Sequence, residues 1–146
     1  AERACTAFAE LGDAWGQGLA LVSAGVAARD AGEPKEAVQH LEESHRRYPD
    51  RIPTATTLAR LLASSPDRSI RDGRRAFDLA TAVYEREPSP VHGETVAIAL
   101  AELGRCDEAA DWMRRAIDDA DRAKDAAEAA RLRGEADTYA VRPCRR

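Results

Sequence analysis

Two histidines on one predicted helix are the first candidates for chemistry in this chain. His40 and His45 flank the segment Leu-Glu-Glu-Ser, which superficially resembles the helix of a zinc protease. Two histidines on a helix bind one metal when they are four residues apart, because both imidazoles then lie on the same face. Here the spacing is five, which turns the two side chains about 140° apart. We therefore expect no metal site and place both histidines at exposed or rim positions.

The acidic residues, the serines and Cys106 also lack the pattern of a known active site. An acidic cluster toward the C-terminus consists of Asp118, Asp119, Asp121 and Asp125. It lacks the fixed loop glycine and alternating ligands of a calcium site, so we interpret it as a solvated helix terminus. No serine lies in a Gly-x-Ser-x-Gly elbow, and the charge of Asp107 disfavours a thiolate at Cys106. We expect no catalytic residues, no enzymatic activity, no metal and no cofactor.

A run of arginines is a candidate for binding rather than catalysis. It consists of Arg68, Arg71, Arg74 and Arg75. The run lies on a predicted loop and at a helix N-terminus, where the helix dipole does not favour positive charge. One interpretation is solubility, with pairing to Asp67 and Asp72. The other is a basic docking patch for an acidic partner or a phosphate group.

The bulk composition narrows the choice of partners. Of 146 residues, 33% are charged with both signs interspersed, and the formal net charge is -4. This balance disfavours a general nucleic-acid binder, which needs an excess of Lys and Arg on one face. No apolar run approaches the ~20 residues of a membrane span, and no signal-peptide pattern opens the chain. We expect a cytoplasmic protein whose partners are neither nucleic acids nor membranes.

The elements that must position these side chains follow a repeat. One short pattern occurs three times. It consists of a small residue, a turn, and then Glu-Ala or Arg-Ala at the start of an amphipathic helix. The matching alanines Ala37, Ala76 and Ala109 lie 39 and 33 residues apart, and a long connection at 66–73 explains the wider interval. A period in the mid-thirties with small residues in phase is typical of stacked helical hairpins.

All regular structure is predicted to be helical. No segment alternates with period two, and Gly and Pro fall mostly between stretches of helical periodicity. We therefore predict an all-α fold in a single domain, 1–146, with helices at 1–11, 14–30, 34–48, 53–65, 74–87, 91–102, 107–120 and 125–140. On the last helix we expect an inner face of Ala126, Ala130, Leu132, Ala136 and Tyr139. Its outer face is expected to consist of Glu128, Arg131, Arg133, Glu135 and Asp137, because a polar outer face closes a stack of repeats.

The order of small residues, leucines and prolines resembles the tetratricopeptide repeat (TPR) family. The matching positions are Ala24-Gly25, Gly32, Ala37, Leu41, Pro49, Leu58-Ala59, Ala76, Ala80, Pro88, Gly104, Ala109 and Ala116. The chain departs from the family pattern at the loop 66–73, at Gly93, where an aromatic residue is usual, and at Asp121 in place of the closing proline. The resemblance implies a right-handed superhelix of about three antiparallel helical hairpins, a TPR-like α-solenoid, with a C-terminal capping helix.

The resemblance also divides the chain. It implies a partial helix of a preceding repeat at 1–13, repeats at 14–51, 52–89 and 90–123, and a capping helix with a tail at 124–146. The second repeat carries the inserted loop. The stretch Leu-Leu-Ala-Ser-Ser-Pro-Asp is similar to a bacterial TPR variant found near protein C-termini, which implies that the chain is a C-terminal fragment of a longer bacterial protein.

The family pattern places one set of residues on a concave groove: Leu19, Val22, Val26, Arg29, Thr56, Arg60, Ser64, Glu94, Ile98 and Glu102. The resemblance thus implies a non-catalytic scaffold that binds a peptide or a partner helix. Arg29 and Arg60, beside an apolar flank, would suit a peptide with an apolar anchor and a carboxylate. The alternative is that these residues pack against neighbouring helices, with Arg29 paired to an acid such as Glu33. The alternative function is a sensor or oligomerisation segment of a larger bacterial regulatory protein, self-associating through the N-terminal edge near Phe8.

The three cysteines, Cys5, Cys106 and Cys144, share no metal-ligand spacing. We interpret them as free thiols in a reducing compartment. A bridge between Cys5 and Cys144 would join the two ends of an elongated stack, which disulfide geometry disfavours. The two tryptophans, Trp15 and Trp112, are expected to fill gaps between helices.

Overall fold

The computed structural model of the chain describes residues 33–139, and every regular element in that range is a helix. The elements are α3 (Pro34–Arg47), α4 (Ile52–Ser64), the 3-10 helix η1 (Arg68–Ile70), α5 (Gly73–Arg86), α6 (Pro90–Glu102), α7 (Cys106–Arg122) and α8 (Ala126–Tyr139). The predicted all-α fold is confirmed for these residues. Each helix predicted within them is present, and η1 lies in the long connection expected at 66–73. The helices predicted at 1–11 and 14–30 lie outside the described residues.

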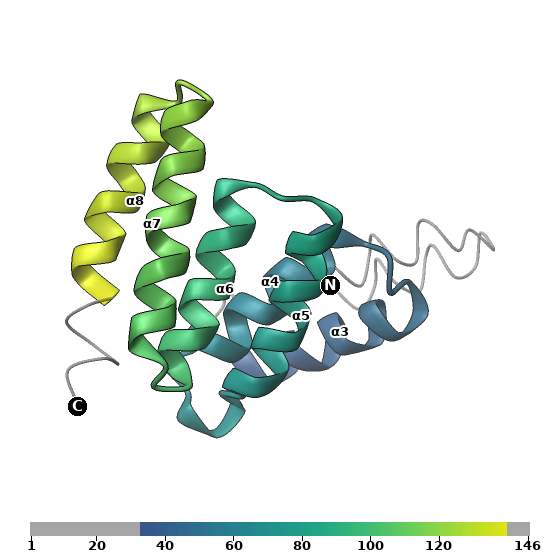
Figure 1. The fold of residues 1–146 in the computed structure, drawn as a ribbon. Helices are drawn as coiled ribbons and strands as arrows, with labels where there is room; N and C mark the ends of the chain where they lie inside the picture. The colour runs from purple at the N-terminus through teal and green to yellow at the C-terminus, as the bar shows by residue number, and fades with distance from the viewer. Residues whose placement is uncertain (1–32, 140–146) are drawn as a thin grey trace.

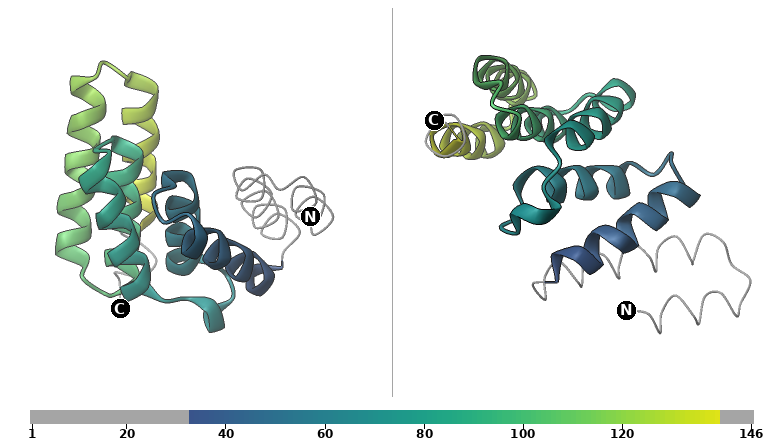
Figure 2. Two further views of the ribbon diagram at one scale, coloured as in Figure 1. Left: turned by 90° about the vertical axis from the view of Figure 1, so that its right-hand side faces the viewer. Right: turned by 90° about the horizontal axis from the view of Figure 1, so that it is seen from below.

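The helices lie in a row with α3 at one end, α7 and α8 at the other, and α4, α5 and α6 between them (Figure 1). Each α-helix packs on the next, while α4 also contacts α6, and α6 also contacts α8. Two further views show the same two ends of the row, with α7 and α8 side by side (Figure 2). Side chains of α4, α6 and α8 can therefore meet although they lie far apart in the sequence.

Capping residues explain where two of these helices begin. The Asp72 carboxylate accepts a hydrogen bond from the Arg75 N–H at 3.0 Å, and the Ser89 hydroxyl accepts one from the His92 N–H at 3.2 Å. Each cap satisfies an N–H group that has no partner within the first helical turn. Pro90 follows Ser89 at the first helical position, where the missing N–H of proline breaks no helical hydrogen bond.

The turn between α6 and α7 is a Schellman motif. The Arg105 N–H donates to the Leu100 carbonyl at 2.9 Å, and the Gly104 N–H donates to the Ala101 carbonyl at 3.0 Å. Gly104 has φ +74°, the left-handed conformation that glycine adopts without a steric penalty. The glycine therefore allows the chain to leave α6 and return along it as α7.

The turn between α7 and α8 has the same hydrogen bonds without the glycine. The Asp125 N–H donates to the Ala120 carbonyl and the Lys124 N–H donates to the Asp121 carbonyl, both at 3.0 Å. Lys124 occupies the left-handed position with φ 57°, and it is the only non-glycine residue with positive φ among residues 33–139. A side chain with a Cβ disfavours this conformation, so the turn is strained where the preceding one at Gly104 is not.

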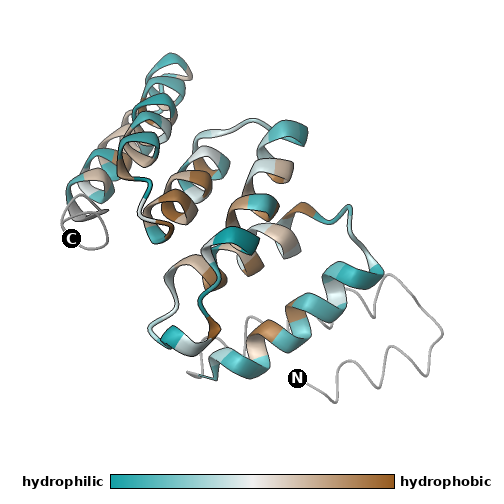
Figure 3. Cartoon of the chain, turned by 60° about the horizontal axis from the view of Figure 1, so that its bottom comes forward, coloured by the Kyte–Doolittle hydropathy of each residue, from teal (hydrophilic) through white to brown (hydrophobic). Residues whose placement is uncertain are grey.

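The centre of the core is α6. Every residue from Gly93 to Ala101 is buried, because α4, α5, α7 and α8 all pack around this helix. The larger apolar cluster spans α3 to α7, and a smaller one is formed by Ala97, Met113, Ala116, Ala120, Ala129 and Leu132. Hydrophobic residues are concentrated on the central helices, whereas α7 and α8 are mostly hydrophilic (Figure 3).

Aromatic residues of the neighbouring helices lie beside Gly93 on α6. The rings of Tyr84 on α5 and Trp112 on α7 meet edge to face, with centroids 4.8 Å apart. A Cβ at Gly93 would lie 3.5 Å from the Tyr84 ring and 3.9 Å from the Trp112 ring. Trp112 also packs against both apolar clusters, so the prediction that it fills a gap between helices is confirmed.

Candidate functional site

Side chains from three helices meet around one buried carboxylate. We name this group the Glu94 cluster; it consists of Arg60 on α4, Glu94 and Thr95 on α6, and Glu128 and Arg131 on α8. Arg131 holds Glu94 with two hydrogen bonds, from Nη1 to Oε1 at 3.2 Å and from Nη2 to Oε2 at 2.5 Å. Arg60 approaches from the other side, with Nη2 3.4 Å from Glu94 Oε2 and Nε donating to Thr95 Oγ1 at 3.1 Å.

The electrostatics of the Glu94 cluster follow from burial. The Glu94 side chain is only 2% exposed, and a carboxylate removed from water is costly unless cations and donors replace its hydration. Arg131 also donates to Glu128, from Nε at 2.9 Å and from Nη2 at 2.7 Å. The hydrogen bonds to Glu128 and to Glu94 raise the pKa of Arg131, and those from Arg131 lower the pKa of Glu128. The cluster is therefore a charge-balanced clamp that joins α8 to α6.

Arg60 is the member of the cluster with donor capacity left for a ligand. Its Nε and Nη2 are engaged by Thr95 and Glu94, and its Nη1 makes no hydrogen bond to any residue in the described range. The side chain is 37% exposed, so this end of the guanidinium reaches solvent. Arg131, in contrast, uses all three of its nitrogens on Glu94 and Glu128. A carboxylate could bind to Arg60 without displacing an existing contact.

The structure brings some of the predicted groove residues together and buries others. Ile98 is 4% exposed within the apolar core, and Glu94 is enclosed by the two arginines, so neither presents surface to a ligand. Ser64 is exposed, and its hydroxyl donates to the Arg60 carbonyl at 2.6 Å. Glu102 pairs with Arg71, with Oε2 to Nη1 at 3.4 Å.

Thr56, the remaining predicted groove residue in the described range, is half-buried. Its hydroxyl oxygen is enclosed and has no hydrogen-bond partner in that range. The other predicted groove residues, Leu19, Val22, Val26 and Arg29, lie outside the described residues, as does Phe8 at the proposed N-terminal edge.

The expectation for the faces of α8 is wrong for Arg131, Ala126 and Ala130. Arg131 is expected on an outer polar face, yet it points to Glu94 on α6 and is the residue that fastens the helix. Ala126 and Ala130, both expected on the inner face, are exposed. Ala129 is buried instead, together with Leu132, which is buried as expected. A period of 3.6 residues allows a broad alanine-rich stripe to be rotated by one position, so hydrophobicity alone does not fix the face.

The four arginines of the predicted basic docking patch do not converge. Arg71 pairs with Glu102 on α6, Arg74 with Asp78 on its own helix at 3.6 Å, and Arg75 with Glu42 on α3 at 3.3 Å. Arg68 is exposed and makes no ion pair within residues 33–139. Of the two interpretations given above, the structure therefore agrees with ion pairing. The partners of Arg71, Arg74 and Arg75 nevertheless differ from the predicted Asp67 and Asp72.

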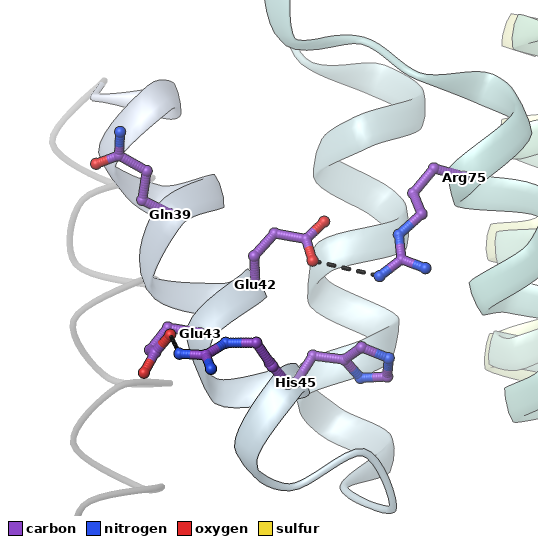
Figure 4. A pocket seen from close by; sticks show the side chains of 6 residues that line it. Gln39, Glu42, Glu43, His45 and Arg75 are labelled. Carbon is purple, nitrogen blue, oxygen red and sulfur yellow. Dashed lines mark hydrogen bonds and ion pairs between the residues drawn. The ribbon is translucent and has the colours of Figure 1, made fainter.

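A polar pocket of about 380 Å³ lies between α3 and α5. It is lined by Gln39, Glu42, Glu43, His45, Arg46 and Arg75. Glu42 and Arg75 point toward each other, whereas Gln39 and Glu43 extend to the other side of α3 (Figure 4). Glu43 is already paired with Arg46 and Arg47. Because the charged groups pair among themselves and do not converge on one point, the pocket has no catalytic arrangement.

His45 is the unusual residue of this pocket. Its Nδ1 is buried and has no hydrogen-bond partner in the described range. Burial lowers the pKa of His45, and the neighbouring positive charge of Arg75 lowers it further. The other histidine of the pair, His40, contacts Glu36 at 3.4 Å. No group of three or more potential His, Cys, Asp or Glu metal ligands occurs within residues 33–139.

The interpretation of all three cysteines as free thiols is wrong. Cys106, the first residue of α7, is disulfide-bonded. The other two cysteines, Cys5 and Cys144, lie outside the described residues. Missing metal-ligand spacing and an odd count give no information on which sulfurs come together in space, so the sequence argument could not detect the bond.

Comparison with known proteins adds no assignment. No protein-family model, no curated protein sequence and no solved structure matches the chain. None of the helices between residues 33 and 139 combines the length and the apolar character that crossing a bilayer requires.

Arg131, Glu128 and Thr95 are the cluster members that sequence reasoning did not select. Arg60 and Thr95 are 35 residues apart, and Glu94 and Arg131 are 37 apart. Both separations equal the repeat period within a few residues, so the signal is present in the sequence. Extending the repeat register into the last helix would align Arg131 with Glu94.

Proposed function

We propose that the chain is a TPR-like stack of antiparallel helical hairpins that serves as a non-catalytic scaffold for a peptide or partner helix. The packing order supports this arrangement, since α4 contacts α6 and α6 contacts α8, while α5 and α7 lie between them in the chain. In such a stack the first helices of successive hairpins line a common surface. The Glu94 cluster lies where these three helices meet.

Arg60 is the observation that carries the proposal. Its guanidinium is held in place by Thr95 and Glu94 and retains a solvent-facing Nη1. Val91 lies one helical turn before Thr95, whose hydroxyl donates to the Val91 carbonyl at 3.0 Å, and Val91 is 42% exposed. A positioned donor beside an exposed apolar side chain would suit a peptide with a carboxylate and a neighbouring apolar residue. A hydrogen bond to a charged group contributes about 1.5–3 kcal/mol.

A peptide-display selection on the purified chain tests this function. We expect enriched peptides to share an acidic residue next to an apolar one, and Arg60→Ala to weaken their binding about tenfold or more. Arg114→Ala is the matched control, because Arg114 is an exposed arginine on α7 that pairs within its own helix. Equal loss in both variants, or enrichment without an acidic residue, would exclude Arg60 as the anchor.

The alternative proposal is a sensor or oligomerisation segment of a larger bacterial regulatory protein. Light scattering of the wild type and of Phe8→Glu separates the two. Self-association through the N-terminal edge predicts a dimer that Phe8→Glu abolishes, whereas a scaffold for foreign peptides does not depend on that edge. The cytoplasmic location stays a prediction. The cysteines no longer support it, because a disulfide at Cys106 favours an oxidising compartment.

A further inference from the structure

The turn between α7 and α8 combines a strained conformation with a sequence that favours helix. Lys124 is left-handed with φ 57°, whereas Gly104 occupies the same position in the preceding turn. No Gly or Pro occurs from Cys106 to Arg133, and the connection is Ala123-Lys124-Asp125. Alanine and lysine are among the strongest helix formers. The same residues could therefore continue α7 directly into α8 as one long helix.

One hydrogen bond opposes this change. The Asp125 carboxylate caps α8 by accepting a hydrogen bond from the Glu128 N–H at 3.0 Å. A continuous helix would lose this cap, but it would also release the left-handed conformation of Lys124. The lost Asp125 cap favours the turn, and the released left-handed conformation of Lys124 favours the continuous helix. Because the two free energies are of similar size, the segment can act as a hinge with two states.

The attachment of α8 is small and specific. Its buried apolar side chains are Ala129 and Leu132, which pack in the smaller cluster with Met113, Ala116 and Ala120. Its ion pairs to other helices in the described range are that of Arg131 with Glu94 on α6 and that of Arg133 with the exposed Asp121 on α7. If α8 moved away, the buried Glu94 would lose its closest cation and an apolar surface would be uncovered.

We propose that the chain exchanges α8 with a second copy of itself, forming a dimer in which α7 and α8 are one continuous helix. The second copy is the occupant with the matching chemistry, since its α8 supplies Leu132 for the apolar cluster and Arg131 for Glu94. The interactions that break when α8 opens form again between the two copies, so the exchange costs little beyond association. The dimer uses the α8 end of the row and differs from the self-association expected at the N-terminal edge.

The first test changes the hinge in the full chain. After refolding from denaturant at increasing protein concentration, light scattering measures the dimer fraction. Lys124→Gly removes the steric cost of the left-handed conformation in the turn, and it also lowers the helix propensity of the continuous α7–α8 helix. Together these effects shift the equilibrium at each hinge about 30-fold toward the turn. With two hinges, the dissociation constant of the dimer should rise on the order of 10³-fold. Lys124→Arg is the matched control and should leave it unchanged, while Asp125→Ala should lower it.

The second test uses charge reversal to identify exchange. Glu94→Arg alone places surplus positive charge in the cluster, and Arg131→Glu alone places surplus negative charge there. Mixed and refolded together, the two variants restore both clusters only if each donates α8 to the other. We expect a heterodimer from the mixture, whereas each single variant alone gives neither a stable monomer nor a stable dimer. The chain carrying both substitutions restores the pair within one copy and between copies alike, so it should show the same monomer–dimer equilibrium as the wild type.

Two results would overturn the proposal. One is a wild-type chain that stays monomeric at every concentration together with a mixture that forms no heterodimer. The other is a dimer that Lys124→Gly leaves unchanged, because its formation would not involve the hinge. Light scattering is repeated in the presence of a reductant, so that a dimer held only by an intermolecular disulfide is not counted as exchange.

Discussion

Removing Arg131 should destabilise the fold far more than removing an exposed arginine two residues away. Arg131→Ala leaves the Glu94 carboxylate buried, with Arg60 Nη2 at 3.4 Å as its remaining cation. Breaking a buried ion pair costs about 3–5 kcal/mol, and the remaining interaction with Arg60 places this case near the lower value, about 3 kcal/mol. For a chain of this length, 1 kcal/mol corresponds to roughly 3 °C, so Tm should fall by about 10 °C.

Arg133→Ala is the matched control for this prediction. Arg133 lies on the same helix and pairs with Asp121 at 2.7 Å, but both side chains are exposed. An exposed pair contributes at most about 1 kcal/mol, because water solvates both charges when the pair is broken. Urea denaturation, followed by circular dichroism at 222 nm as the usual helical signal, measures both losses on the same scale.

A third variant separates the charge from the packing. In Glu94→Gln/Arg131→Ala the buried group is a neutral amide, so the uncompensated charge is gone while the size of the side chain is kept. We expect this double variant to recover at least about 1 kcal/mol relative to Arg131→Ala. If Arg131→Ala costs no more than Arg133→Ala, Glu94 is not held by Arg131 and the reasoning is refuted.

Three further predictions concern single positions. Gly93→Ala should stabilise the fold by up to about 1 kcal/mol, since its Cβ would lie no closer than 3.5 Å to a neighbour; a loss in thermal unfolding would show that the aromatic pair needs more room. Gly104→Ala should cost about 1 kcal/mol or more at φ +74°, and an unchanged Tm would contradict the left-handed turn. The folded-state pKa of His45 is lowered by burial, so the unfolded chain binds its proton first as pH falls. The resulting stability is present above pH ~6.5 and lost below it toward the folded-state pKa, and His45→Gln should flatten this part of the stability–pH profile.

The helices could be predicted from the sequence because their signals are local. Ser89-Pro90 marks the start of α6, and Gly104 marks the turn after it. The break between α7 and α8 could be predicted although no glycine signals it, because the TPR resemblance divides the chain after residue 123. The rotation of α8 could not be predicted, since several alanines can serve equally well as the buried stripe.

The chemistry of the Glu94 cluster depends on contacts that no local pattern contains. A glutamate on an amphipathic helix normally indicates an exposed position, yet Glu94 is enclosed because α6 is surrounded on all sides. That enclosure results from the packing of four other helices. The disulfide at Cys106 could not be predicted from a local pattern either, because it depends on which sulfurs are close in space.

The Glu94 cluster has a physical role that an alanine-rich core cannot fill. Small side chains such as Ala97, Ala116 and Ala129 make shallow contacts, so helices packed through them can slide or rotate at low cost. A buried carboxylate on α6 that is held by arginines from α4 and α8 has one low-energy position. Any slip of α8 along α6 would bury Glu94 without Arg131, at the cost of breaking the ion pair. We therefore expect Glu94→Met/Arg131→Leu to keep much of its stability while losing sharp helix register, visible as broadened NMR signals from α8 and less cooperative unfolding.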